Sequence, residues 1–165
     1  MTQTWLLLTY EISLISCTLV AGVFLTFSDF VMRSLDGART SAAVEVMQGI
    51  NREVFKTVFM VLLIGMWAVT AALGAFAYIG ALGSGSTSIL WAAIIYSVGV
   101  AGVTLVFNVP MNNRLAAQAY DSPEGAAYWT NVYYPRWKFW NWVRGIASAV
   151  AAVLYLNACL QLVQG

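Results

Sequence analysis

The sequence predicts an all-α integral membrane protein, a four-helix transmembrane bundle with one short interfacial amphipathic helix. Hydrophobic residue types make up 61% of the 165 residues and charged types only 9%, whereas a soluble domain usually carries about 25% charged residues. Four apolar segments also reach the roughly 20 residues that a helix needs to cross a bilayer. A soluble fold of this length could not bury so much apolar surface, so we expect the lipid bilayer to be its solvent.

The predicted spans lie within a single membrane domain of residues 1–165. No charged residue occurs between Lys56 and Arg114, a stretch too long for one span, and the flexible segment Gly83–Ser88 divides it into two. Nothing after Arg144 is charged. These limits place the four spans at about residues 5–32, 54–82, 89–109 and 142–163.

Two longer connections link the spans. The first runs from Arg33 to Glu53, where Thr40 or Ser41 can cap a short helix. Its apolar side chains recur at helical spacing, which predicts an interfacial amphipathic helix running into the second span; these are Ala43, Met47, Ile50 and Val54. In the second connection Ser122 and Pro123 predict a helix start, and the segment Tyr133–Pro135 predicts its end.

The distribution of basic residues predicts the orientation of the chain. All eight Lys and Arg residues flank the two long connections, and the Gly-Ser turn and both terminal segments have none. By the positive-inside rule the long connections are cytoplasmic and both termini lie outside. The net charge of +1 argues against nucleic acid as a partner. Because the chain has no His, it lacks the commonest metal ligand, and we expect neither a metal site nor a cofactor.

The strong polar residues gather at the predicted cytoplasmic end, where all four spans deliver some. Asn108 and Asn112 are four residues apart and so share a helix face, with Pro110 between them. Trp137 precedes Asn141 by four residues, and Trp140 precedes Arg144 by four. This helical spacing would place an aromatic ring beside each of the two polar side chains. The candidate site residues are Asp29, Asn51, Asn108, Asn112, Trp137, Trp140, Asn141 and Arg144.

A structural interpretation of the same residues stays open. Asn and Arg side chains can cap helix ends and anchor a span at the interface, and Arg144 can either snorkel outward or pair with Asp29. Glu11 lies in the first span near the opposite membrane face. It is either a functional ionisable group or a carboxylate close enough to the surface to be hydrated.

Three segments resemble the signature of the anthrone oxygenase-like family of small four-helix membrane proteins. They are Met47–Arg52, Phe107–Asn113 and Trp137–Arg144, the last two carrying N-x-P-x-N and W-x-x-W-N-x-x-R. The resemblance extends over nearly the whole chain and implies a four-span fold. For members linked to aromatic polyketides, it implies oxidation of anthrones to anthraquinones by molecular oxygen; many relatives have no assigned substrate. The expected location is the bacterial inner membrane.

Two functions therefore compete. The first is an oxidoreductase-like enzyme that oxygenates a lipophilic aromatic molecule without a cofactor, with Asp29 as the base and the Asn side chains and Arg144 as donors to the anion. The second is a non-catalytic membrane subunit or binding module that holds a lipid, a pigment or a partner protein. Whether the chain pairs with another membrane protein or with its own copies is left open. A transporter is disfavoured because no internal repeat is evident.

Overall fold

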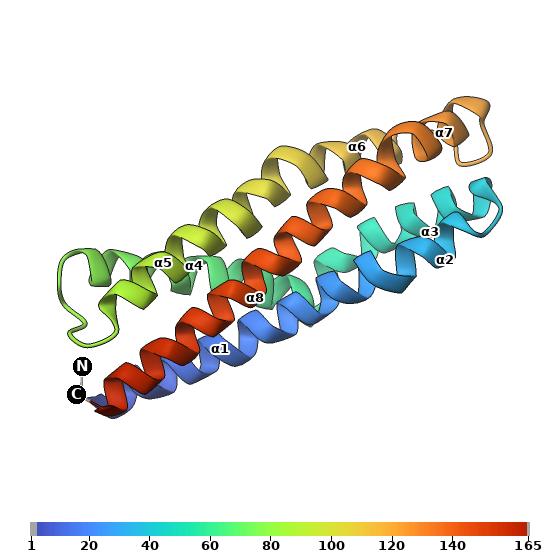
Figure 1. Ribbon diagram of the computed structural model, residues 1–165. Helices are drawn as coiled ribbons and strands as arrows, with labels where there is room; N and C mark the ends of the chain where they lie inside the picture. The colour runs from blue at the N-terminus through green and yellow to red at the C-terminus, as the bar shows by residue number, and fades with distance from the viewer. Residues whose placement is uncertain (1–2, 165) are drawn as a thin grey trace.

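The structure is a computed structural model that describes residues 3–164. All regular secondary structure within these residues is helical, which confirms the predicted all-α bundle. Four continuous helices are long and apolar enough to cross a membrane: Gln3–Asp36, Val58–Tyr78, Ser86–Ala116 and Pro123–Gln164. They run alternately up and down the bundle, so that the two ends of the chain lie at the same end (Figure 1).

Short π-helical or 3₁₀ segments, labelled η, divide three of the long helices and follow the short helix α3. The first long helix consists of α1 (Gln3–Thr26), η1 (Phe27–Val31) and α2 (Met32–Asp36). Then come α3 (Thr40–Glu53), η2 (Val54–Lys56) and α4 (Val58–Tyr78). The third long helix consists of α5 (Ser86–Tyr96), η3 (Ser97–Gly102), η4 (Thr104–Asn108) and α6 (Val109–Ala116). The fourth consists of α7 (Pro123–Tyr128), η5 (Trp129–Tyr133) and α8 (Tyr134–Gln164).

Small residues bring the helices close together in the bundle. Helix α1 packs on α8 and α4, and α5 packs on the same two helices from the other side. A Cβ added at Gly99 would stand 2.5 Å from Cβ of Ala147 in α8, and one at Gly74 in α4 would overlap Ala93 in α5. Apolar side chains such as Ile12, Val61 and Val153 cover the outside of the bundle and are more than half exposed, as expected for a surface that faces lipid.

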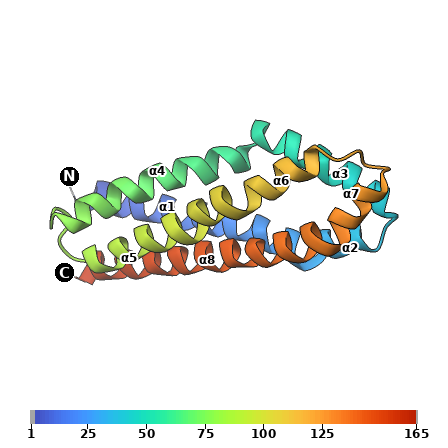
Figure 2. The ribbon, with the colours of Figure 1, turned by 90° about the horizontal axis from the view of Figure 1, so that it is seen from above.

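The bundle is longer than the thickness of a bilayer core and extends beyond it at one end. The fourth helix has 42 residues, whereas a membrane core needs about 20. Its first part, together with α2, α3 and α6, forms an extension (Figures 1 and 2) with its own buried cluster. Helix α3 contributes an apolar face to this cluster through Ala43, Val44 and Met47, so the predicted amphipathic helix is present and packs against the ends of the spans.

Three local predictions were wrong. The helix that begins after Ser122 does not end at Pro135, because the wide π-helical turn η5 ends two residues before the proline and the chain remains helical to Gln164. The amphipathic helix does not run directly into the second span, since Thr57 is extended and its hydroxyl caps the start of α4. Neither Thr40 nor Ser41 caps α3, whose N-cap position is Arg39.

Candidate functional site: a cavity around a buried arginine

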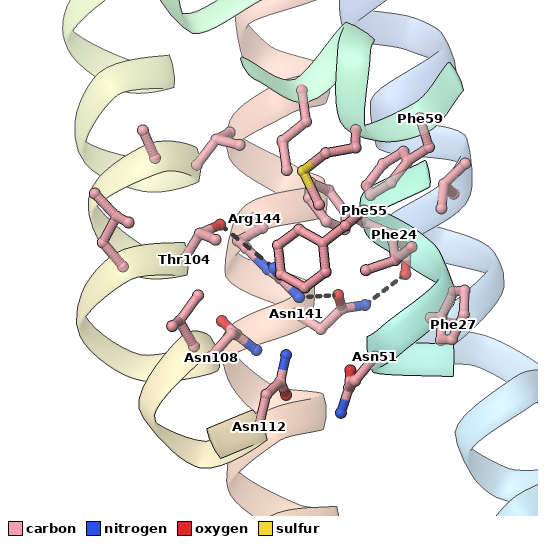
Figure 3. A pocket seen from close by; sticks show the side chains of 18 of the residues that line it. Phe24, Phe27, Asn51, Phe55, Phe59, Thr104, Asn108, Asn112, Asn141 and Arg144 are labelled. Carbon is pink, nitrogen blue, oxygen red and sulfur yellow. Dashed lines mark hydrogen bonds between the residues drawn. The ribbon is translucent and has the colours of Figure 1, made fainter. Parts of the chain in front are cut away.

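A cavity of about 310 Å³ lies where the bundle core meets the extension. All four long helices and α3 line it. Figure 3 shows side chains from these helices pointing toward one another around this space. The structure brings six of the eight sequence-predicted residues into its lining: Asn51, Asn108, Asn112, Trp137, Asn141 and Arg144.

The guanidinium of Arg144 is buried, with only 6% of the residue exposed. One nitrogen donates to Oδ1 of Asn141 at 2.6 Å and another to the Thr104 hydroxyl at 3.3 Å, while Nε has no hydrogen-bond partner. Within residues 3–164 the only ion pairs are Arg33–Asp29 and Lys56–Glu53, so no carboxylate there balances its charge. Burying a cation without a paired anion costs free energy. The cavity beside the guanidinium provides space for an anionic group.

Aromatic rings and an amide hold this guanidinium in place. Its carbon lies 4.4 Å from the ring centre of Phe24 and 5.4 Å from that of Trp137, distances at which cation–π attraction operates. The amide of Asn141 donates to the Phe24 carbonyl at 2.7 Å and to the Ser28 hydroxyl at 2.6 Å. The arginine is therefore fixed through contacts to the first helix and does not snorkel outward.

A second group of polar side chains lines the end of the cavity nearest the extension. Oδ1 of Asn112 accepts hydrogen bonds from the Tyr133 hydroxyl and the Trp137 indole, both at 2.8 Å. Asn51 donates to the same hydroxyl at 3.2 Å. These bonds orient Asn112 so that its amide nitrogen points into the cavity (Figure 3). Oδ1 of Asn108 is buried and has no partner among the described residues.

The remaining walls of the cavity are apolar, and the cavity has a lateral opening on the side of the bundle. Phe24, Phe27, Phe55 and Phe59 surround the polar groups (Figure 3). At the rim, Phe55 is 69% exposed, and Ile64 of α4 and Leu105 of the third helix are each 57% exposed. The exposed rim residues Ile64 and Leu105 belong to α4 and η4, so the opening lies between α4 and the third helix, on the apolar outside of the bundle.

Asp29 and Trp140 do not line this cavity. Asp29 is exposed and forms a 2.6 Å ion pair with Arg33. Its neighbour Ser28 is buried against Asn141, whereas the side chain of Asp29 is 57% exposed, so the carboxylate points away from the site. The predicted alternative of an Asp29–Arg144 pair is therefore wrong. Trp140 stacks on Phe107 with ring centres 3.7 Å apart, outside the cavity.

The sequence interpretation missed three polar contributors to the site. Thr104 is not part of either sequence motif. It precedes Asn108 by four residues, however, and that helical spacing indicates that both side chains share one face of the helix. Tyr133 was predicted to help end a helix, although it is buried and bonded to both Asn51 and Asn112. Ser28 gave no signal, since its role depends on packing against α8.

The cavity combines aromatic walls with guanidinium and amide hydrogen-bond donors. Aromatic walls are suited to contact with flat apolar groups, and guanidinium and amide donors are suited to oxygen acceptors. The cavity lining contains no acid, Cys or His, and the described part of the chain holds no cluster of three side chains suited to a metal ion.

Comparison with known families identifies a relationship. The model of the anthrone oxygenase family matches residues 52–154. The match includes both predicted motifs and the cavity residues from Asn108 to Arg144, and leaves out Asn51 and the first helix. Comparisons with curated proteins and with solved structures gave no significant match. Because the matched segment is more than half of the chain, this protein belongs to the anthrone oxygenase family.

Proposed function

We propose that the protein is embedded in a bacterial inner membrane with its extension on the cytoplasmic side. The four apolar helices support the membrane location, and the basic residues around the extension support the orientation. Single cysteines at Ser84 and Ala117, in a variant whose buried Cys17 and Cys159 are replaced by Ala, test it. An impermeant maleimide added to intact cells should label the first position only; labelling of the second position only would reverse the orientation.

We propose that the cavity binds an anthrone-type aromatic molecule as its anion and promotes its reaction with molecular oxygen. The observation that carries this proposal is the buried Arg144 without a carboxylate partner beside an apolar cavity. An anthrone becomes anionic when its methylene carbon loses a proton and the charge moves to the carbonyl oxygen. The guanidinium would favour this anion over the neutral ketone, which is the preference that speeds the reaction.

The proposed reaction balances with oxygen alone. The methylene carbon of the anion gives its electrons to dioxygen and forms a carbon–oxygen bond. The resulting peroxide takes back one proton to become a hydroperoxide. Loss of water then breaks the oxygen–oxygen bond and leaves a second carbonyl. One anthrone and one dioxygen thus give one anthraquinone and one water.

The side chains act by binding and orientation in this scheme. Arg144 faces the charged oxygen, and the amide of Asn112 donates a second hydrogen bond. Phe24 and Trp137 pack on the ring system. Since the cavity lining contains no carboxylate, we propose that the proton leaves to water, and we expect Asp29→Asn to keep most of the wild-type turnover.

The test is turnover by the purified protein in a neutral detergent with anthrone as the substrate. Oxygen consumption and anthraquinone absorbance should rise together at equal molar rates. Arg144→Gln should lower kcat/KM by about 10²-fold, the usual effect of removing one oxyanion donor, while Arg33→Gln, an exposed arginine, should not change it.

The non-catalytic alternative makes a different prediction for the same preparation. A folded wild-type protein that retains an aromatic ligand at one equivalent, but consumes no oxygen above the uncatalysed rate, would show a binding module rather than an enzyme. Equal turnover by wild type and Arg144→Gln would also contradict the proposed role of the cavity.

A further inference from the structure

A second hollow lies on another side of the bundle, between α6 and the fourth helix. It is an open groove of about 530 Å³. Trp140 stacks flat on Phe107 there, with the ring planes 4° apart. Trp140 belongs to the W-x-x-W-N-x-x-R motif, but the proposed reaction does not use it. Trp140, which does not line the first cavity, therefore lines this second groove.

Two arginines from different helices line this groove. Arg114 of α6 and Arg136 of α8 are both exposed. Arg114 lies 4.8 Å from the ring centre of Tyr128, and neither arginine forms an ion pair within residues 3–164. No acidic residue lines the groove. Two guanidinium groups without carboxylates are suited to a phosphate group.

The groove also changes in polarity along the bundle axis. Val106, Phe107 and Trp140 line its part next to the apolar spans, and Arg114 lies beyond them toward the extension. A phospholipid has the same order of groups, with acyl chains in the membrane core and a phosphodiester at the interface. Basic pockets between helices at the cytoplasmic interface favour anionic head groups.

We propose that this groove is a binding site for an anionic phospholipid. The phosphodiester lies between Arg114 and Arg136, and an acyl chain passes over the stacked Phe107 and Trp140. A zwitterionic head group is disfavoured because the groove lining offers no carboxylate for its ammonium. This inference rests on the proposed membrane location and is independent of the proposed reaction.

Native mass spectrometry of the full chain in a neutral detergent tests the site. With phosphatidylglycerol and phosphatidylcholine added in equal amounts, the wild type should retain several-fold more of the anionic lipid. The double variant Arg114→Gln with Arg136→Gln should lose roughly tenfold in retention of phosphatidylglycerol. The matched control, Arg39→Gln with Lys138→Gln, removes two cations from the same end of the bundle and should keep the preference.

Three results would overturn the proposal. They are the absence of a lipid preference in the wild type, an equal loss in the control pair, and displacement of the lipid by millimolar inorganic phosphate, which would indicate a small-anion site. Trp140→Ala should reduce retention of both lipids while keeping the preference for phosphatidylglycerol, and circular dichroism checks that each variant is folded. A chain that stays soluble without detergent would contradict the membrane location itself, whatever the lipid result.

Discussion

Asn141 accepts a 2.6 Å hydrogen bond from the guanidinium of Arg144, one helical turn further along α8. The same amide donates to the Phe24 carbonyl and the Ser28 hydroxyl. A neutral side chain thus orients a buried cation without cancelling its charge, which leaves that charge available to a ligand in the cavity.

Asn141→Asp should convert this arrangement into an internal ion pair. The new carboxylate would neutralise Arg144, so we expect kcat/KM for anthrone to fall by about tenfold or more. Ser28 can donate to the carboxylate, but the Phe24 carbonyl loses its donor, so circular dichroism checks that the variant is folded. Oxygen consumption measures the loss, and Asn113→Asp, an exposed position at the same end, is the control. Unchanged turnover in Asn141→Asp would contradict the idea that the free charge matters.

The hydrogen bond between Tyr133 and Asn112 should contribute to stability as a coupled pair. Asn112→Ala removes the acceptor of the Trp137 indole and leaves the buried hydroxyl of Tyr133 with only the bond from Asn51, and should cost about 2 kcal/mol. Tyr133→Phe should cost less. Equilibrium unfolding in mixed micelles of the two single variants and the double variant should give a coupling energy of about 1 kcal/mol, and strict additivity would contradict this bond.

Gly99→Ala and Gly65→Ala should have opposite effects. A Cβ at Gly99 would stand 2.5 Å from the Ala147 side chain, whereas a Cβ at Gly65 meets nothing within 4 Å. We expect the first to destabilise the bundle by about 1–3 kcal/mol and the second to stabilise it by about 0.5–1 kcal/mol. Thermal unfolding in detergent compares them, and a stabilised Gly99→Ala would show that these helices can separate at little cost.

Leu105→Trp should narrow the lateral opening of the cavity. Leu105 is 57% exposed at the rim, and a larger ring there would slow the passage of a flat aromatic molecule from the membrane. We expect kcat/KM to fall several-fold, by about 1 kcal/mol, with unfolding unchanged. Val98→Trp, on an exposed apolar position of the same helix outside the cavity, is the control, and equal effects of both variants would contradict a lateral route.

The sequence alone determined the class of fold and the end of the bundle that carries the polar groups. The long stretch without charge between Lys56 and Arg114 predicts two helices and a turn, because a charged side chain inside a lipid-facing helix is costly. Since distance along a helix follows directly from residue number, Asn108, Asn141 and Arg144 were correctly expected at one end. The unbroken helix through Pro135 was missed because π-helical turns have no reliable sequence signal.

Only the tertiary structure decided which side chains face the cavity. Trp137 and Trp140 are equally good aromatic neighbours in the sequence, yet the first lies under Arg144 and the second stacks on Phe107 outside. Asp29 and Ser28 are adjacent, yet only Ser28 reaches Asn141. The physical reason is that the rotation of each helix about its axis depends on packing between helices, through contacts such as Gly99 with Ala147, and spacing along one chain does not contain that information.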